Sequence, residues 1–239
     1  HVRAGFNGGN LYDNSEKVSV GLSYRSKIKM KVKEGEAELN YANRTIEELM
    51  GVLGQKVPQL AVPKYDQGTF HAQLPLPSNT TLGVSYRPSE KWELAFDLQY
   101  VGWNAYDSLN VYFNEEELGI APIKAGKDYK NTVVARVGAQ YKTTDRLFLR
   151  AGVYFDQSPI RKDNYNPETP GMNKIGMSAG CSFEPYRNLQ IDFAFLYIQG
   201  LARNGSYTSR NIVTGMEDKF EGRYHSNAVT VSWGLAYKF

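Results

Sequence analysis

The amino-acid sequence predicts an all-β protein, an antiparallel transmembrane β-barrel. Apolar residues recur at every second position in about nine segments, which is the period of a strand with one apolar face. Short turns alternate with long polar segments between these strands. Mean hydropathy is −0.49. One uncharged run, Gln67–Tyr86, exceeds the roughly 18 residues of a spanning helix, but Pro75 and Pro77 lie inside it, so a helical span is excluded.

Alternation is clearest in three segments, Val18–Val32, Glu90–Asn104 and Val229–Phe239. In the second, large apolar residues from Trp92 to Tyr100 share one face, and the other face is small or polar. Because successive strand residues point to opposite sides of a sheet, each segment predicts a two-faced strand. The remaining strands are expected at Val2–Tyr12, Thr80–Tyr86, Val133–Tyr141, Leu147–Phe155, Ile175–Phe183 and Leu189–Tyr197.

The faces opposite the apolar ones decide between a membrane barrel and a soluble β-sandwich. A sandwich packs its inner face and carries mostly charged residues outside. Here the polar faces consist of small residues with an occasional charge, which is unusual for a solvent surface. They fit the lumen of a barrel whose outer face contacts lipid. The sandwich remains the alternative interpretation.

The connections between strands are of two kinds. Short turns are expected at Asp13–Lys17, Pro88–Lys91, Thr143–Arg146 and Pro185–Asn188, and long polar segments at Glu34–Gly68, Asn114–Tyr129, Ser158–Gly171 and Asn204–Glu221. Outer-membrane barrels have short periplasmic turns and long exterior loops, so the last strand should run inward and end at Phe239. Nine is an odd number and bacterial barrels have even ones. Residues 1–239 are therefore expected to form a single domain, the C-terminal portion of a larger barrel.

Several short motifs occur in a fixed order along the chain. They are Ser19–Lys29, Leu74–Pro77 followed by Gly83–Tyr86, Trp92 followed by Tyr100–Trp103, Phe155–Pro159, and the terminal Tyr237–Phe239. In this order and spacing they resemble the FadL family of outer-membrane transporters of long-chain fatty acids and hydrocarbons. The resemblance implies a fourteen-stranded barrel plugged by an N-terminal hatch, of which this chain is about the last nine strands.

The resemblance also implies a function. We expect passive transport of a long-chain fatty acid or another hydrophobic small molecule across the bacterial outer membrane. The expected surroundings are outer-membrane lipid, the expected state is a monomer, and no cofactor is implied. Two alternatives stay open. A general diffusion porin would have a water-filled pore with opposed charge stripes, and a structural or adhesive barrel would have its function in the loops.

Other classes of protein are disfavoured by composition. The chain has 28 Lys+Arg and 25 Asp+Glu. This near-balance of charge argues against a polybasic arm such as nucleic-acid-binding proteins carry. Cys181 is the one cysteine, which excludes an internal disulfide and a cysteine-based metal site. No nucleotide or phosphate motif is present. His225 lies an even number of residues before Val229, so its side chain is expected on the same outer face, away from the lumen. No enzyme is therefore expected.

Charged residues on the expected lumen faces are candidates for ligand binding. Arg25, Lys27, Arg136 and Arg150 share these faces with Glu93, Asp97 and Asp192. They could pair across the lumen and hold the barrel's shape. Alternatively, a cation could bind a fatty acid carboxylate while the tail lies on apolar surface. The resemblance further implies a head-group lysine in the loop before the strand near Tyr129, a position that both Lys124 and Lys127 fit.

A helix is predicted within the first long polar segment. Thr45–Glu48 has the pattern of a capping box, and Gly54 is expected to stop the helix. Four apolar residues follow at helical spacing, Ile46, Leu49, Met50 and Leu53. They could pack as a lid on neighbouring loops, or they could form an apolar landing patch for a hydrophobic ligand at the outer mouth.

Overall fold

The computed structural model describes residues 4–38, 43–56, 67–114, 122–165, 171–210 and 216–238. The chain divides into two compact units. The larger unit comprises Gly5–Lys27, Pro77–Ala105 and Asp128–Phe239, and the smaller unit comprises His1–Ala4, Ile28–Leu76 and Tyr106–Lys127. Within the described ranges, no helix is long and apolar enough to cross a membrane.

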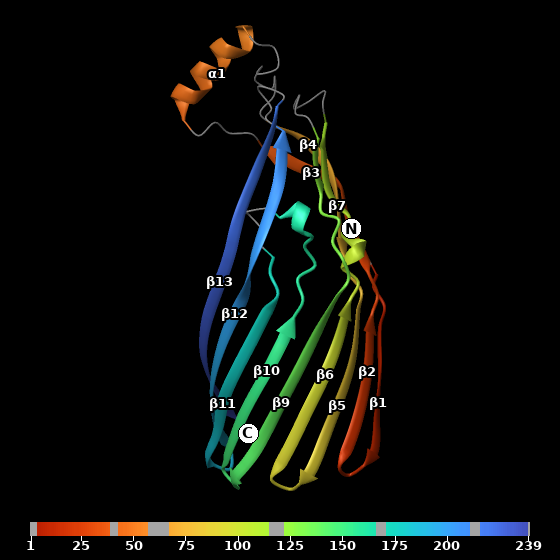
Figure 1. Ribbon diagram of the computed structural model, residues 1–239, viewed down its shortest axis with the longest axis vertical. Helices are drawn as coiled ribbons and strands as arrows, with labels where there is room; N and C mark the ends of the chain where they lie inside the picture. The colour runs from red at the N-terminus through yellow and green to blue at the C-terminus, as the bar shows by residue number, and fades with distance from the viewer. Residues whose placement is uncertain are drawn as a thin grey trace. The chain divides into compact units, whose positions relative to one another are not determined.

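The larger unit is one antiparallel sheet of nine strands (Figure 1). About nine strands are predicted for the chain, and this sheet contains nine, but the described residues also form a second sheet of four strands. The sheet order follows the chain, and β1 and β13 are its two edges. The strands are β1 (Asn7–Ser15), β2 (Val18–Arg25), β5 (Asn79–Ser89), β6 (Trp92–Val101), β9 (Thr132–Thr144), β10 (Leu147–Asp156), β11 (Lys174–Tyr186), β12 (Leu189–Arg210) and β13 (Glu217–Tyr237).

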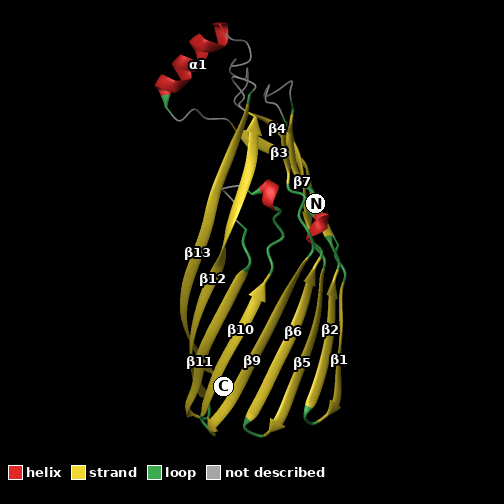
Figure 2. Cartoon of the chain, viewed as in Figure 1, coloured by secondary structure: helices red, strands yellow, loops and turns green. Residues whose placement is uncertain are grey.

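Four two-residue turns join these strands at one end of the sheet (Figure 2). They fall inside the four predicted short turns. Three of them directly follow a hydroxyl residue, Ser15, Ser89 or Thr144. Each hydroxyl oxygen accepts a hydrogen bond from the backbone N–H of the residue two positions later, at 3.2, 3.4 and 3.2 Å. Such side-chain bonds stabilise tight turns, which explains why the sequence placed these turns correctly.

The predicted strand Val18–Val32 is wrong as a single strand. It divides into β2 and β3 (Ile28–Glu38), which belong to different sheets. At the break, Ser26 donates its backbone N–H to Phe6 O at 2.8 Å. The neighbouring strand β5 begins just after Pro77, which has no N–H to donate to a ladder. The first strand also differs from the prediction, since β1 begins at Asn7 and extends to Ser15.

The predicted loop Asn204–Glu221 is also wrong. β12 and β13 pair as far as Arg210 and Glu217, and both reach well beyond β11 (Figure 1). A bulge places Leu201 and Ala202 opposite His225 and shifts the register. Beyond the bulge both faces are largely polar, so the apolar alternation that reveals a strand is lost there.

The smaller unit holds a second antiparallel sheet with the order β3-β4-β7-β8. Its other strands are β4 (Gln67–Leu76), β7 (Ser108–Phe113) and β8 (Ile123–Gly126), none of which was predicted as a separate strand. The predicted helix is confirmed as α1 (Arg44–Lys56). It begins one residue before Thr45 and continues past Gly54, so the predicted stop is wrong. Arg44 and Glu48 form an i,i+4 ion pair at 3.4 Å that supports the first turn.

Two short 3₁₀ helices complete the larger unit. They are η2 (Trp103–Ala105) and η3 (Lys162–Asn164). η2 follows the end of β6, where Gly102 donates its N–H to Ser78 O at 2.9 Å. The η3 helix lies in the connection after β10, within the predicted polar segment Ser158–Gly171.

One face of the nine-stranded sheet, the outer face, has the features of a lipid-facing wall. Large apolar side chains on it remain exposed, such as Phe96 at 40% and Trp233 at 82%. On β6 this band runs from Trp92, which packs on Tyr141, to Tyr100, a length of about 26 Å at roughly 3.3 Å per residue. Aromatic residues at both limits of an apolar band are typical of outer-membrane barrels.

Candidate functional site

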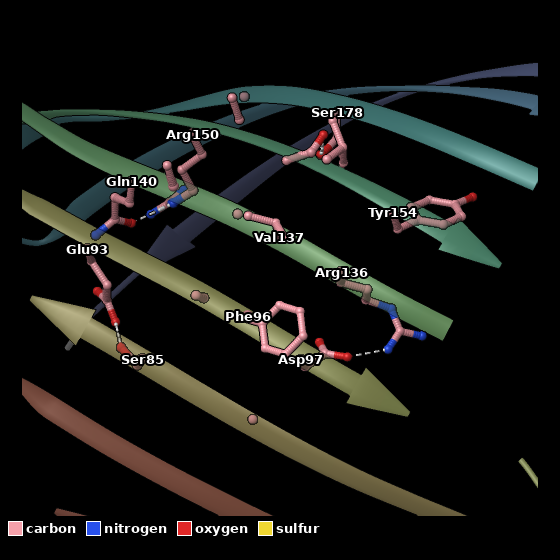
Figure 3. A pocket seen from close by; sticks show the side chains of 18 of the residues that line it. Ser85, Glu93, Phe96, Asp97, Arg136, Val137, Gln140, Arg150, Tyr154 and Ser178 are labelled. Atoms are coloured by element: carbon pink, nitrogen blue, oxygen red, sulfur yellow. Dashed lines mark hydrogen bonds and ion pairs between the residues drawn. The ribbon is translucent and has the colours of Figure 1, made fainter. Parts of the chain in front are cut away.

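The opposite face, the inner face, bears a trough of about 1070 Å³ that is lined by residues of the larger unit. The lining also includes residues that strand alternation assigns to the outer face, such as Phe96 and Val137. Glycine, alanine and serine from successive strands make up nearly half of the lining and form the floor of the trough. Gly21 pairs with Gly83, Gly138 with Gly152, and Gly152 with Ser178. Because these residues lack long side chains, the floor leaves room for another molecule (Figure 3).

Several of these glycines have free space above them. A Cβ atom at Gly138 would come no closer than 3.7 Å to the Ala151 carbonyl oxygen, and one at Gly83 would have its nearest contact at 4.0 Å. Both distances are ordinary van der Waals contacts. By contrast, a Cβ at Gly176 would overlap the Tyr154 ring. Thus Gly176 is needed for packing, whereas Gly83 and Gly138 keep the trough open.

The first charged network on the inner face centres on Arg136 of β9. Its Nη1 donates to Asp97 Oδ1 at 2.7 Å, and its Nη2 donates to Gln99 Oε1 at 2.8 Å (Figure 3 shows the Asp97 bond). Gln99 in turn donates to Asn79 Oδ1 at 3.0 Å. The network therefore connects β9 with β6 and β5 along the wall and neutralises the guanidinium.

A second network centres on Arg150 of β10. Its Nε donates to Gln140 Oε1 at 2.7 Å on β9, and its Nη1 donates to the Ser182 hydroxyl on β11. Ser182 donates onward to Asp192 of β12, whose carboxylate also lies 3.8 Å from Arg150. This chain of polar groups connects four neighbouring strands. It leaves the charge of Arg150 balanced by Asp192.

The remaining inner-face charges have different surroundings. Glu93 accepts from Ser85 at 3.0 Å and pairs with Arg87 at 3.4 Å. Arg25 lies at the end of β2 opposite Asn7 and Asn79, and no ion pair to it is found among the described residues. Pairing of lumen charges was expected across the lumen. The pairs instead join nearby strands of one wall, because adjacent strands bring inward residues within hydrogen-bond reach.

The connection after β10 packs on the inner face of the β12–β13 extension. Tyr165 is fully buried; its ring lies 4.4 Å from that of Tyr224, and the Arg203 guanidinium is 5.3 Å from its centroid. Its backbone N–H donates to Ser206 O at 3.1 Å. The sequence predicts a polar loop here and does not predict this contact. Buried Ile160, Tyr165 and Met172 were the available signal.

The other predicted site residues lie in the smaller unit. Lys124 belongs to β8, opposite Asn110 in register, and its side chain lies outside the described residues. Lys127 follows β8, is half-buried, and donates its N–H to Asp107 O at 2.7 Å. On α1, Leu49 is 55% exposed and Leu53 is half-buried. The side chains of Ile46 and Met50 lie outside the described part of the chain.

The three histidines and the possible metal ligands complete the inventory. His225 lies on the outer face of β13, as expected, with its Nε2 atom 2.9 Å from Gln199 Nε2. His71 stacks on Tyr112 in the smaller unit. His1 lies outside the described residues. In the ranges that the structure describes, no cluster of three His, Cys, Asp or Glu residues could hold a metal ion.

Comparison with known proteins gives a consistent result. A family model described as "Outer membrane protein transport protein (OMPP1/FadL/TodX)" matches residues 1–239. A putative outer membrane protein of Neisseria meningitidis is 24% identical over 241 residues, covering 96% of this chain and 49% of that protein. The long-chain fatty acid transport protein of Escherichia coli is 22% identical over 196 residues, covering 82% of this chain and 42% of that protein. The chain thus spans about half the length of these relatives.

Solved structures with the same fold exist. A Pseudomonas aeruginosa FadL homologue superposes with a TM-score of 0.80 at 22% identity, covering 98% of this chain and 52% of that one. The CymD monoaromatic hydrocarbon channel gives a TM-score of 0.59 at 20% identity, covering 97% and 50%. At this identity the likeness establishes the fold: the nine-stranded sheet is part of an antiparallel outer-membrane β-barrel.

Proposed function

Since the chain belongs to the OMPP1/FadL/TodX family of outer membrane transport proteins, we propose that the full-length protein is a passive transporter of hydrophobic small molecules. Long-chain fatty acids and aromatic hydrocarbons are the two substrate classes suggested by the names of its relatives. It would act as a monomer in outer-membrane lipid and not as an enzyme. Residues 1–239 would form the C-terminal portion of one barrel domain.

The observation that carries this proposal is the trough itself. Its floor of glycine, alanine and serine offers space without long side chains. The arginines beside that space are neutralised within the wall, Arg136 by Asp97 and Arg150 by Asp192. A cation that is paired with a carboxylate holds water less strongly than a free cation does. An apolar solute can therefore pass close to it more easily. Such a surface suits the passage of molecules that have little charge of their own.

The porin alternative is less well supported by the same residues. A wide diffusion pore was expected to have separate stripes of opposite charge. On this face, acids and bases alternate and are paired at 2.7 to 3.8 Å. The adhesive alternative would leave the lumen inert, and it gives no reason for keeping Gly83 and Gly138 free of side chains.

Contacts to a fatty acid head group are a further part of the proposal. Arg136 and Arg150 are already paired, which favours a role in holding the wall's shape. Arg25, Lys124 and Lys127 are the other candidates for a carboxylate contact, because a cation binds a carboxylate with charge-assisted hydrogen bonds. The exposed Leu49 side chain supports a role of α1 as an apolar landing patch.

The test uses two residues of β9 whose side chains point to opposite faces of the sheet. Gly138→Phe places a ring in the trough, whereas Ala135→Phe places the same ring on the outer face, where Ala135 pairs with Leu98 and does not line the trough. Uptake of a labelled long-chain fatty acid and of toluene is measured in de-energised cells that make the full-length protein. We expect Gly138→Phe to reduce uptake severalfold and Ala135→Phe to leave it near wild type.

Two outcomes would contradict the proposal. Equal uptake by both variants and the wild type would mean that the trough is not the route. Loss of uptake in de-energised wild-type cells, with normal uptake in energised cells, would mean that transport is not passive. The folded fraction of each variant is measured by comparing the gel mobility of unheated and heated samples. This measurement separates a blocked route from failed assembly.

A further inference from the structure

The smaller unit has a pocket of its own, distinct from the trough. It has a volume of about 610 Å³ and lies on one face of the four-stranded sheet. Two cross-strand rows of polar residues line it. The first row is Lys31, Gln73 and Asn110, and the second is Lys33, His71 and Tyr112.

The rows arise from the strand register. Lys31 pairs with Gln73, and Gln73 pairs with Asn110, so these three residues share one face. His71 pairs with Tyr112 two residues further along, and their rings stack at 4.8 Å with an interplanar angle of 10°. Strands lie about 4.8 Å apart, which brings the side chains of each row within reach of one small ligand.

A β-bulge adds the second lysine to the pocket. The ladder runs from the pair Val32 and Ala72 to the pair Gly35 and Phe70, so Lys33 and Glu34 both lie opposite His71. A bulge supplies one extra residue and redirects side chains locally. As a result Lys33 lines the pocket beside Lys31, and Glu34 does not.

The charge of this pocket is unbalanced. Both lysines are exposed, and within the described ranges no ion pair joins either one to a carboxylate. In the described part of the smaller unit, no acidic residue lines the pocket. An acid on the same face, Glu36, pairs with Thr69, one row beyond His71. Two ammonium groups therefore face a space that also contains the amides of Gln73 and Asn110 and the hydroxyl of Ser108, which accepts from Asn110 at 3.1 Å.

We propose that this pocket binds a phosphate dianion, either free or as the phosphomonoester head group of an amphiphile. A phosphate group carries about −1.5 to −2 charge near neutral pH and has three strong acceptor oxygens. Two lysines match that charge, and neutral donors of the two rows can meet the remaining oxygen. A carboxylate, with one charge and two oxygens, would leave one lysine uncompensated. The proposal is independent of the trough and would stand if transport failed.

The test compares three variants of the full-length protein in a nonionic detergent and phosphate-free buffer. Binding of inorganic phosphate and of acetate is measured by titration calorimetry. The double variant Lys31→Gln/Lys33→Gln removes both pocket charges, and Lys31→Arg/Lys33→Arg keeps them. The matched control is Lys29→Gln, because Lys29 lies on the same strand opposite Pro75 and does not line the pocket.

We expect phosphate to bind more tightly than acetate. The double Gln variant should lose affinity by on the order of tenfold or more, and the Arg variant and Lys29→Gln should stay near wild type. No phosphate binding, equal binding of acetate, or an equal loss with Lys29→Gln would overturn the proposal. The last result would mean a diffuse surface charge effect.

A second arm identifies the source of the phosphate. Phosphatidic acid, a phosphomonoester lipid, and phosphatidylglycerol, a phosphodiester, are presented in mixed micelles. Binding of phosphatidic acid alone, competed by inorganic phosphate and lost in the double Gln variant, would assign the pocket to a lipid head group. Binding of inorganic phosphate without phosphatidic acid would assign it to free phosphate. Preferential binding of phosphatidylglycerol would contradict a site for a dianion.

Discussion

Arg136 shows how a single charged residue is accommodated in this wall. Its guanidinium donates in two directions, to Asp97 and to Gln99, at 2.7 and 2.8 Å. Because both of its terminal nitrogens already donate to these partners, the guanidinium has fewer donors left for a ligand. The arginine is therefore better understood as part of the wall than as a free ligand-binding cation.

At the residue scale, the two faces of β6 should respond oppositely to the same substitution. Phe96→Arg places a charge in the lipid-facing band and should destabilise the folded barrel by about 2–4 kcal/mol. Ala95→Arg places it on the inner face, beside Glu93 and Asp97, and should cost far less. Urea unfolding of the full-length protein in lipid vesicles measures both. Similar losses for the two variants would contradict the assignment of the faces.

Lys127 gives a second prediction at this scale. If it binds a fatty acid head group, Lys127→Ala should remove a charge-assisted hydrogen bond worth roughly 1.5–3 kcal/mol. Affinity for a long-chain acid should then fall about ten- to a hundredfold, while a hydrocarbon of equal length should bind almost unchanged. Fluorescence displacement with the full-length protein measures both ligands. If both affinities fall alike, the lysine shapes its surroundings and does not contact the head group.

At the scale of elements, the β12–β13 extension serves as the surface on which the connection after β10 is anchored. Tyr165 is held by the backbone bond to Ser206 and lies against Gly205, Arg203 and Tyr224. Burial raises the pKa of the Tyr165 hydroxyl above its ordinary value, so the side chain stays neutral at physiological pH. Among the described residues, neither its hydroxyl nor that of Tyr224 has a hydrogen-bond partner, and the rings of the two tyrosines pack at 4.4 Å.

Gly205 should be essential for this anchoring. A Cβ atom there would overlap the Tyr165 ring, so Gly205→Val should displace Tyr165 and loosen η3. Limited trypsinolysis of the full-length protein should then cut faster after Arg161 or Lys162. Asn204→Val, the neighbouring substitution on the opposite face, is the control and should leave the rate unchanged. An unaltered rate for Gly205→Val would show that the ring does not anchor the segment.

At the scale of the whole chain, the edges of the nine-stranded sheet matter most. β1 and β13 each present one unpaired side among the described residues. In a bilayer an unpaired row of N–H and C=O groups is very costly, which is why membrane sheets close on themselves. We therefore expect both edges to be paired in the membrane-embedded protein.

Orientation in the membrane is the prediction that belongs to this scale. With Cys181 first changed to Ser, single cysteines at Glu90 and Asp145 probe the two-residue turns, and cysteines at Asp163 and Glu217 probe the opposite end of the larger unit. Because short turns face the periplasm in outer-membrane barrels, an impermeant maleimide should label only the second pair on intact cells. The reverse pattern would invert the orientation.

The strands of the larger unit could be predicted because lipid imposes a strict pattern. From Trp92 to Tyr100 every second residue is apolar, and the intervening residues point to the inner face. Hydroxyl residues and prolines marked the turns. Helix α1 was predictable from the spacing of Leu49 and Leu53, although its ends were not, since Arg44 and Glu48 extend it at the start.

The sequence by itself determined which residues face lipid, because the recurrence of apolar residues at every second position is a local property of the chain. Only the tertiary structure decided which polar residues come together: Arg136 with Asp97, Arg150 with Asp192 and Tyr165 with Arg203 as contacts, and Lys33 and His71 as lining residues of one pocket. These partners lie far apart in the sequence or are brought together by a bulge. Their meeting depends on strand register, which pairing across the sheet sets and hydrophobic alternation alone does not reveal.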